Sequence, residues 1–145
     1  MDSIYLGKSL EKINSHVIRP LMNESISAGF PSPADDYIDI GIDLNEHLIK
    51  NPISTFFLRV SGNSMTNAGI YDKDLIIVDR SINPKIGDII IAVLDDLFIL
   101  KRLSQINNKL YLEPANNDYP NIDISKYEKF QVWGVAIYCV HNLTR

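Results

Sequence analysis

Residues 88–103 read DIIIAVLDDLFILKRL, and this stretch indicates the fold. Two apolar runs of strand length flank Asp95-Asp96, a pair that suits the two-residue loop of a β-hairpin. Side chains alternate between the two faces of a strand. The second run therefore places on one face Leu97, Ile99, Lys101 and Leu103. We expect an antiparallel hairpin whose second strand carries a lysine within an apolar row.

The segments around this hairpin have the same strand-like composition. From residue 55 onward the candidate strands are Thr55–Val60, Asp74–Asp79, Asp88–Leu94, Leu97–Leu103, Lys109–Glu113 and Gln131–His141. Turn-forming pairs such as Asn83-Pro84 and Asn107-Asn108 separate them. Because this close spacing leaves no room for crossover helices, the sequence predicts a mainly β protein with a compact antiparallel β body.

The N-terminal part of the chain has a different character. Residues 1–28 are polar and their charges cancel, so the net charge of −4 lies on residues 29–145. A short helix over Leu10–Leu21 would be interrupted by Pro20. Residues 28–34 read AGFPSPA, which favours an extended, exposed segment. We interpret residues 1–28 as a mobile arm and residues 29–145 as the β domain.

A short helix is expected directly before the strands. Asp43 is a plausible N-cap, Glu46 lies three positions later, and Pro52 ends the segment. Its apolar stripe would consist of Leu44, Leu48 and Ile49.

Composition excludes several classes of function. The chain has 145 residues, a net charge of −4 and one cysteine, Cys139. The acidic balance argues against direct, tight DNA binding. A single cysteine permits no internal disulfide and no zinc cluster, and Cys139 is expected to be a small core residue. The histidines, His16, His47 and His141, show no ligand-like spacing, so we expect no metal and no cofactor. No membrane span or signal peptide is visible, which predicts a cytoplasmic protein.

Two short features could carry chemistry. Ser64 lies in VSGNSM, residues 60–65, directly after a predicted strand. Gly62 allows a sharp turn there, and free backbone N–H groups beside a serine can form an oxyanion hole. The alternative is an ordinary turn at the end of a strand. Lys101 is either a lysine that snorkels at a strand edge or a desolvated general base for Ser64.

Together these segments resemble the LexA/UmuD family of self-cleaving Ser–Lys peptidases. The residues that carry the resemblance are Ala28–Ala34 with Asp36-Tyr37 and Ile42–Asn45, then SGNSM at 61–65, then Asp88–Val93 with Phe98–Arg102, and Val132–Ile137 near the end. The 37-residue separation of Ser64 and Lys101 is of the family's kind. One departure is Asp72-Lys73-Asp74, where the family commonly has glycine in the centre. Lys73 would be strained if this turn needs a positive φ.

The resemblance implies a serine peptidase with Ser64 as nucleophile and Lys101 as general base. It implies a scissile bond between Ala28 and Gly29, with oxyanion donors near Ser64 and Met65. It further implies an SOS-response mutagenesis protein that forms a homodimer and is stimulated by a RecA filament on single-stranded DNA. The trimmed form would serve a UmuC-like error-prone polymerase in translesion synthesis. The alternatives are a non-enzymatic β-fold binding subunit and a LexA-like repressor fragment.

Overall fold

The computed structural model describes residues 16–22, 25–30 and 38–144, and the chain divides into two compact units. Unit 1 spans Met1–Lys50 and unit 2 spans Asn51–Arg145. Parts of the segments discussed above fall outside the described residues: residues 10–15 of the stretch Leu10–Leu21, residues 31–34 of AGFPSPA, and Asp36-Tyr37 of the family resemblance. The expected boundary at 28–29 is that of a cleavage product and stays a prediction.

Unit 1 contains a small antiparallel sheet followed by a short helix. Strand β1 (Ile18–Met22) pairs with β2 (Ile38–Asp43). A Cβ atom on Gly41 would lie 2.5 Å from Cγ2 of Ile18, so glycine permits this close pairing. Helix α2 (Leu44–Leu48) begins where the Asp43 side chain accepts a hydrogen bond from Asn45 N–H at 3.0 Å. The predicted N-cap is thereby confirmed.

The described end of the stretch Leu10–Leu21, in which Pro20 argued against a helix, is not helical. Residues 18–22 form β1 instead. Pro20 lies in a strand of a two-stranded sheet, where each strand has a free edge and a missing N–H is tolerated. Pro20, which argues against a helix, is thus compatible with the strand.

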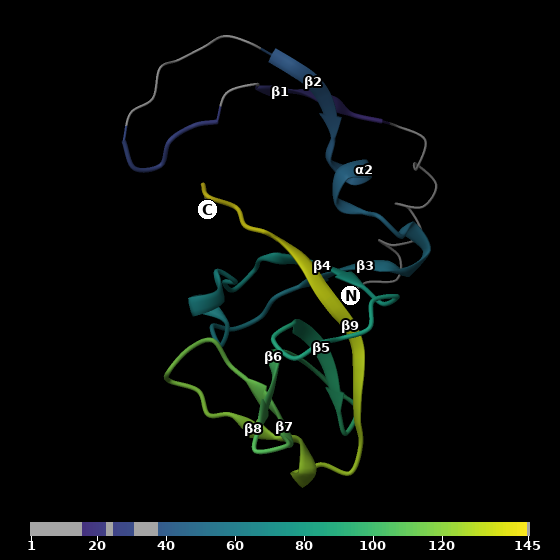
Figure 1. Ribbon diagram of the computed structural model, residues 1–145, viewed down its shortest axis with the longest axis vertical. Coiled ribbons are helices and arrows are strands. Elements are labelled where there is room, and N and C mark those ends of the chain that lie inside the picture. The colour runs from purple at the N-terminus through teal and green to yellow at the C-terminus, as the bar shows by residue number, and fades with distance from the viewer. Residues whose placement is uncertain (1–15, 23–24, 31–37, 145) are drawn as a thin grey trace. The chain divides into compact units, whose positions relative to one another are not determined.

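Unit 2 is built on one seven-stranded antiparallel sheet, which confirms the mainly β fold class. Its strands are β3 (Thr55–Arg59), β4 (Leu75–Asp79), β5 (Ile89–Leu94), β6 (Leu97–Ile106), β7 (Lys109–Glu113), β8 (Ile122–Asp123) and β9 (Phe130–Val140). The order is β3-β4-β9-β5-β6-β7-β8. The last strand therefore inserts between β4 and β5, as the long yellow strand in Figure 1 shows. Short 3₁₀ turns cover Pro52–Ser54, Thr66–Ala68 and Ile124–Lys126.

Two hairpins follow the turn chemistry read from the sequence. Asp95 and Asp96 have φ values of 46° and 72°, and Asn107 and Asn108 have 51° and 66°. Positive φ at both central residues defines the type I′ turn, which Asp and Asn tolerate better than most residues. The first hairpin fixes the register of β5 against β6, so that Lys101 lies opposite Ile90.

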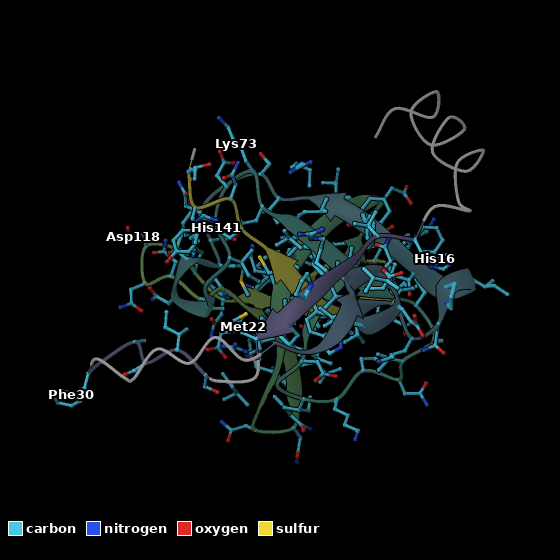
Figure 2. All side chains as sticks on the ribbon, turned by 90° about the horizontal axis from the view of Figure 1, so that it is seen from above. His16, Met22, Phe30, Lys73, Asp118 and His141 are labelled. Atoms are coloured by element: carbon cyan, nitrogen blue, oxygen red, sulfur yellow. The ribbon has the colours of Figure 1, made fainter. Side chains whose placement is uncertain are left out.

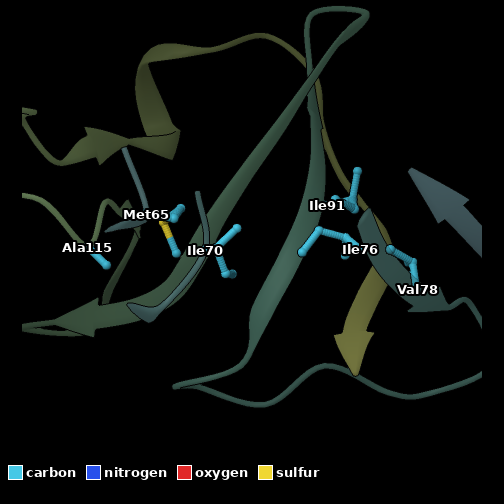
Figure 3. Packing of buried hydrophobic residues seen from close by; sticks show 6 residues of the cluster. All are labelled: Met65, Ile70, Ile76, Val78, Ile91 and Ala115. Carbon is cyan, nitrogen blue, oxygen red and sulfur yellow. The ribbon is translucent and has the colours of Figure 1, made fainter. Parts of the chain in front are cut away.

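The core of unit 2 forms on both faces of β5. One cluster consists of Met65, Ile70, Ile76, Val78, Ile91 and Ala115. The other consists of Ile90, Ala92, Leu94, Leu103, Leu112 and Val135. Figure 3 shows Met65 between Ala115 and Ile70 in the first cluster. Met65 comes from the loop after β3, so this loop is anchored in the core.

Lys73 adopts the left-handed backbone conformation that the sequence comparison with the family suggested. Its φ is +73°, and its side chain is exposed at the periphery in Figure 2. A residue with a Cβ atom in this region costs about 1–2 kcal/mol, and glycine costs about 0.5–1 kcal/mol in chain entropy. We therefore expect Lys73→Gly to raise the free energy of unfolding by about 0.5–1 kcal/mol.

Urea denaturation of the full chain measures this effect. Lys85→Gly is the matched control, because Lys85 is exposed but has no positive φ. The control should lose stability. An equal loss in Lys73→Gly would show that Lys73 carries no strain.

None of the described helices is long and apolar enough to cross a membrane.

Candidate active site

Ser64 lies in the loop that joins β3 to β4. The base of this loop is closed by hydrogen bonds from Val60 N–H to Asp74 O and from Lys73 N–H to Val60 O, both at 2.8 Å. Gly62 turns the chain with φ +96°, and its N–H donates to Oδ1 of Asp72 at 2.8 Å. Since a side chain at this φ would be strained, glycine makes the turn that presents Ser64.

Lys101 meets Ser64 directly. Its Nζ donates a hydrogen bond to Ser64 Oγ at 2.7 Å and a second one to Leu100 O at 3.2 Å. The lysine is only 8% exposed, and it stands on the same face of β6 as Ile99 and Leu103. The snorkelling alternative is therefore wrong for this side chain, because its amine is inside rather than in solvent.

Burial shifts the lysine toward its neutral form. It lowers the pKa of Lys101 below the ordinary value, because a desolvated ammonium is costly. Among the described residues, no carboxylate forms an ion pair with Lys101 that would counteract this effect. A neutral amine at 2.7 Å can accept the proton of Ser64 Oγ and so activate the oxygen as a nucleophile.

The predicted oxyanion donors lie beside this pair. The carbonyl of Ser64 accepts a hydrogen bond from Ala115 N–H at 2.8 Å. Within the described part of the chain, the N–H groups of Ser64 and Met65 have no hydrogen-bond acceptor. Unpaired backbone N–H groups next to a nucleophile are the donors that an oxyanion requires.

Sequence reasoning missed the residues that hold this loop from the other side. Asn116 Nδ2 donates to Asn63 O at 2.8 Å and to Thr66 Oγ1 at 3.3 Å. Asn67 N–H donates to Ala115 O at 2.7 Å. The pair Asn116-Asn117 has the composition of a turn, and no local pattern links it to residues about 50 positions earlier.

Ala28 and Gly29 belong to unit 1, so their approach to Ser64 forms part of the proposal below. Both are exposed, and they lie in a bend in which Ser27 Oγ accepts a hydrogen bond from Phe30 N–H at 3.0 Å. Phe30 is 86% exposed, and Figure 2 shows its side chain at the tip of this segment. A Cβ atom on Gly29 would meet nothing within 4 Å in the structure, so the bond is accessible.

A second polar cluster surrounds the buried carboxylate of Asp74. Asp74 is 3% exposed and pairs with His141 Nδ1 at 2.5 Å, while Cys139 Sγ donates to its other oxygen at 3.2 Å. Burial and the Asp74 carboxylate raise the pKa of Cys139 to about 12, so the thiol stays protonated. No serine in the described residues hydrogen-bonds to His141, and a Ser-His-Asp triad therefore has no support there.

The described residues offer no group of three His, Cys, Asp or Glu side chains that could hold a metal ion.

Comparison with known proteins places these residues in a wider context. A family model described as Peptidase S24-like matches residues 20–137. The chain is 39% identical to the protein ImpA of Escherichia coli over 142 residues, which is 98% of this chain and 97% of ImpA. It is 42% identical to SamA of Salmonella typhimurium over 123 residues, 85% of each chain. It is also 33% identical to the LexA repressor of Paracidovorax citrulli over 128 residues, 88% of this chain and 56% of the repressor.

Proposed function

Because the chain belongs to the Peptidase S24-like family, in its LexA/UmuD branch, we propose that it is a UmuD-like mutagenesis protein that cleaves itself between Ala28 and Gly29. Ser64 is the nucleophile and Lys101 the general base. The observation that carries the proposal is the contact of 2.7 Å between Lys101 Nζ and Ser64 Oγ, made by a buried lysine without an ion-pair partner among the described residues.

The reaction follows from these groups. Neutral Lys101 takes the Oγ proton of Ser64 while Oγ bonds to the carbonyl carbon of Ala28. The N–H groups of Ser64 and Met65 stabilise the negative oxygen that forms. Collapse breaks the bond to Gly29, whose nitrogen leaves as an amine with the proton held by Lys101. Neutral Lys101 then takes a proton from a water molecule, whose oxygen bonds to the carbonyl carbon of Ala28. The ester bond to Ser64 Oγ breaks, Lys101 returns the proton to Oγ, and residues 1–28 leave with a C-terminal carboxylate.

Self-cleavage is suited to a modest catalyst. When the substrate is part of the same protein, intramolecular geometry replaces a bimolecular encounter and supplies much of the rate. The reaction then depends on how often the arm docks at Ser64, and a partner that binds the docked form increases this population. We propose that a RecA filament on single-stranded DNA is this partner.

The product has its own proposed role. Residues 29–145 would form a homodimer that joins a UmuC-like error-prone polymerase in translesion synthesis within the SOS response. Residues 1–28 would be the arm that cleavage removes. The similarity to ImpA and SamA over most of both chains supports this assignment over that of a LexA-like repressor fragment.

Intact-mass analysis of the full chain tests the proposal. The purified protein is incubated between pH 6 and pH 10, with and without RecA, single-stranded DNA and a nucleotide. We expect loss of residues 1–28 in the wild type and an intact chain in Ser64→Ala. Without RecA the rate should rise about tenfold per pH unit and level off below the ~10.4 of an exposed lysine, because only the neutral amine is active.

Other outcomes contradict the proposal in distinct ways. A cut at another bond would refute Ala28–Gly29 as the scissile bond. A folded wild type that stays intact under every condition would favour the non-enzymatic binding subunit, and a pull-down for a polymerase would follow.

A further inference from the structure

The loop between β7 and β8 donates hydrogen bonds to the carbonyl groups of the turn that contains Ser64. Ala115 N–H donates to Ser64 O at 2.8 Å, and Asn116 Nδ2 donates to Asn63 O at 2.8 Å. The two bonds come from adjacent residues of one loop and reach adjacent carbonyls of the other. Two successive peptide units of the Ser64 turn are therefore fixed.

These two peptide units carry the N–H groups of Ser64 and Met65, the donors that the proposed function assigns to the oxyanion. A trans peptide is planar, with its C=O and N–H pointing in opposite directions. The C=O of Asn63 shares a plane with the N–H of Ser64, and the C=O of Ser64 shares one with the N–H of Met65. Since both carbonyls point to the loop at 115–116, both N–H groups point away from it. Within the described residues neither N–H has an acceptor.

We propose that Asn116 is a positioning residue for self-cleavage, which holds the backbone N–H groups of Ser64 and Met65 in the orientation that stabilises the oxyanion. The inference rests on the proposed function. Asn116 touches no reacting atom and acts through the peptide plane that it holds. Ala115 does the same for the next plane, but through its backbone, so Asn116 is the side chain whose replacement tests the idea.

The Asn116 amide is itself locked. Its Oδ1 accepts a hydrogen bond from Asp118 N–H at 2.9 Å, and its backbone carbonyl accepts one from Tyr119 N–H at 3.2 Å. With Oδ1 engaged in this way, Nδ2 is the end that faces Asn63 and Thr66, both of which present acceptors. Ala115 and Met65 share one core cluster, so the two loops are also packed together.

Two variants and one matched control test the role in the full chain. Asn116→Leu keeps approximately the size of the side chain without its donors, and Asn116→Ala removes both. Asn117→Leu is the control, because Asn117 lies next to Asn116, is exposed and has no hydrogen bond to the described residues. The measurement is the rate of self-cleavage by intact mass across pH 6 to pH 10, together with the thermal midpoint.

A misplaced donor should slow the reaction at every pH. We expect the plateau rate to fall by about 10- to 100-fold in both Asn116 variants, with the pH of half-maximal rate unchanged. A role through Lys101 would instead move that pH. Asn117→Leu should stay within about twofold of the wild type. Plateau rates within twofold of the wild type in the Asn116 variants, or a shifted pH with an unchanged plateau, overturn the inference.

Backbone amide NMR signals give a readout that does not need cleavage. In uncut protein at pH 6, the signals of Ser64 and Met65 should shift in Asn116→Leu and stay in place in Asn117→Leu. Unchanged signals overturn the inference whether or not the protein cuts itself. A wild type that never cleaves refutes the proposed function. A wild type that cleaves at the same rate as Asn116→Leu refutes only the role of Asn116.

Discussion

Self-cleavage is expected to fall by about 10²–10⁴-fold when Lys101 is replaced by arginine, although the positive charge is kept. The guanidinium of arginine stays protonated in proteins and cannot accept the proton of Ser64 Oγ. The contact of 2.7 Å would then hold a donor where the reaction needs a base. The rate is measured by intact mass on the full chain at an alkaline pH at which the wild-type rate has levelled off.

Lys101→Met separates the loss of the base from a loss of folding. Burial lowers the pKa of Lys101, so the unfolded chain binds more protons between this lowered pKa and about 10.4. Stability therefore rises with pH across that window, and below it the buried ammonium destabilises the fold. Methionine removes this penalty.

We expect Lys101→Met to stay uncut and to melt at a higher temperature than the wild type at pH 7. A variant that is more stable and inactive cannot owe its inactivity to unfolding. Cleavage of Lys101→Arg or Lys101→Met at the wild-type rate would contradict the role of Lys101 as the base.

The largest loss of stability is expected from Asp79→Ala, at about 3 kcal/mol in the free energy of unfolding. Asp79 is 1% exposed. Its carboxylate accepts hydrogen bonds at 2.7–2.8 Å from Asn51 Nδ2, from Ser54 Oγ and from the N–H and Oγ of Ser81. Alanine removes the buried acceptor that these donors share, and the connections before β3 and after β4 lose their common anchor.

The stabilisation by Asp79 has a definite pH dependence. Burial alone would raise its pKa, but the hydrogen bonds from Asn51, Ser81 and Ser54 outweigh burial and lower it. A carboxyl group with a depressed pKa stabilises the fold fully above its unfolded-state pKa of about 3.9. This stabilisation is lost as the pH falls through the folded-state pKa. The difference between wild type and Asp79→Ala should thus be constant from pH 5 to pH 8 and shrink in acid.

Urea denaturation at several pH values measures this difference. Asp118→Ala is the control, because Asp118 is exposed and labelled at the surface in Figure 2, and it should change stability by less than about 0.5 kcal/mol. A loss below about 1 kcal/mol in Asp79→Ala would mean that water satisfies the donors in its place.

Local chemistry made much of the fold predictable. The six strands expected from residue 55 onward occur within a few residues of their predicted ends. The strand β8 was missed because its two residues are too few to show a period. The strand β1 was missed because Pro20 is read as a breaker, although an edge strand tolerates it. The turn at Asp95-Asp96 was predictable because its residues adopt positive φ readily.

The sequence by itself determined which groups are available for chemistry and roughly where the chain turns. The motif around Ser64, the alternation that places Lys101 in an apolar row and the turn residues all depend on neighbours within a few positions, where local sterics decide. Only the tertiary structure decided that Lys101 is buried against Ser64, that Asn116 holds the Ser64 turn and that Asp79 collects its donors. Apart from the bonds between Ser81 and Asp79, these contacts join segments 25 to 53 residues apart, and they depend on the order of the strands and on the packing of the loops on the core. Sheet order and packing are set by the burial of the whole apolar surface, and no local pattern encodes them.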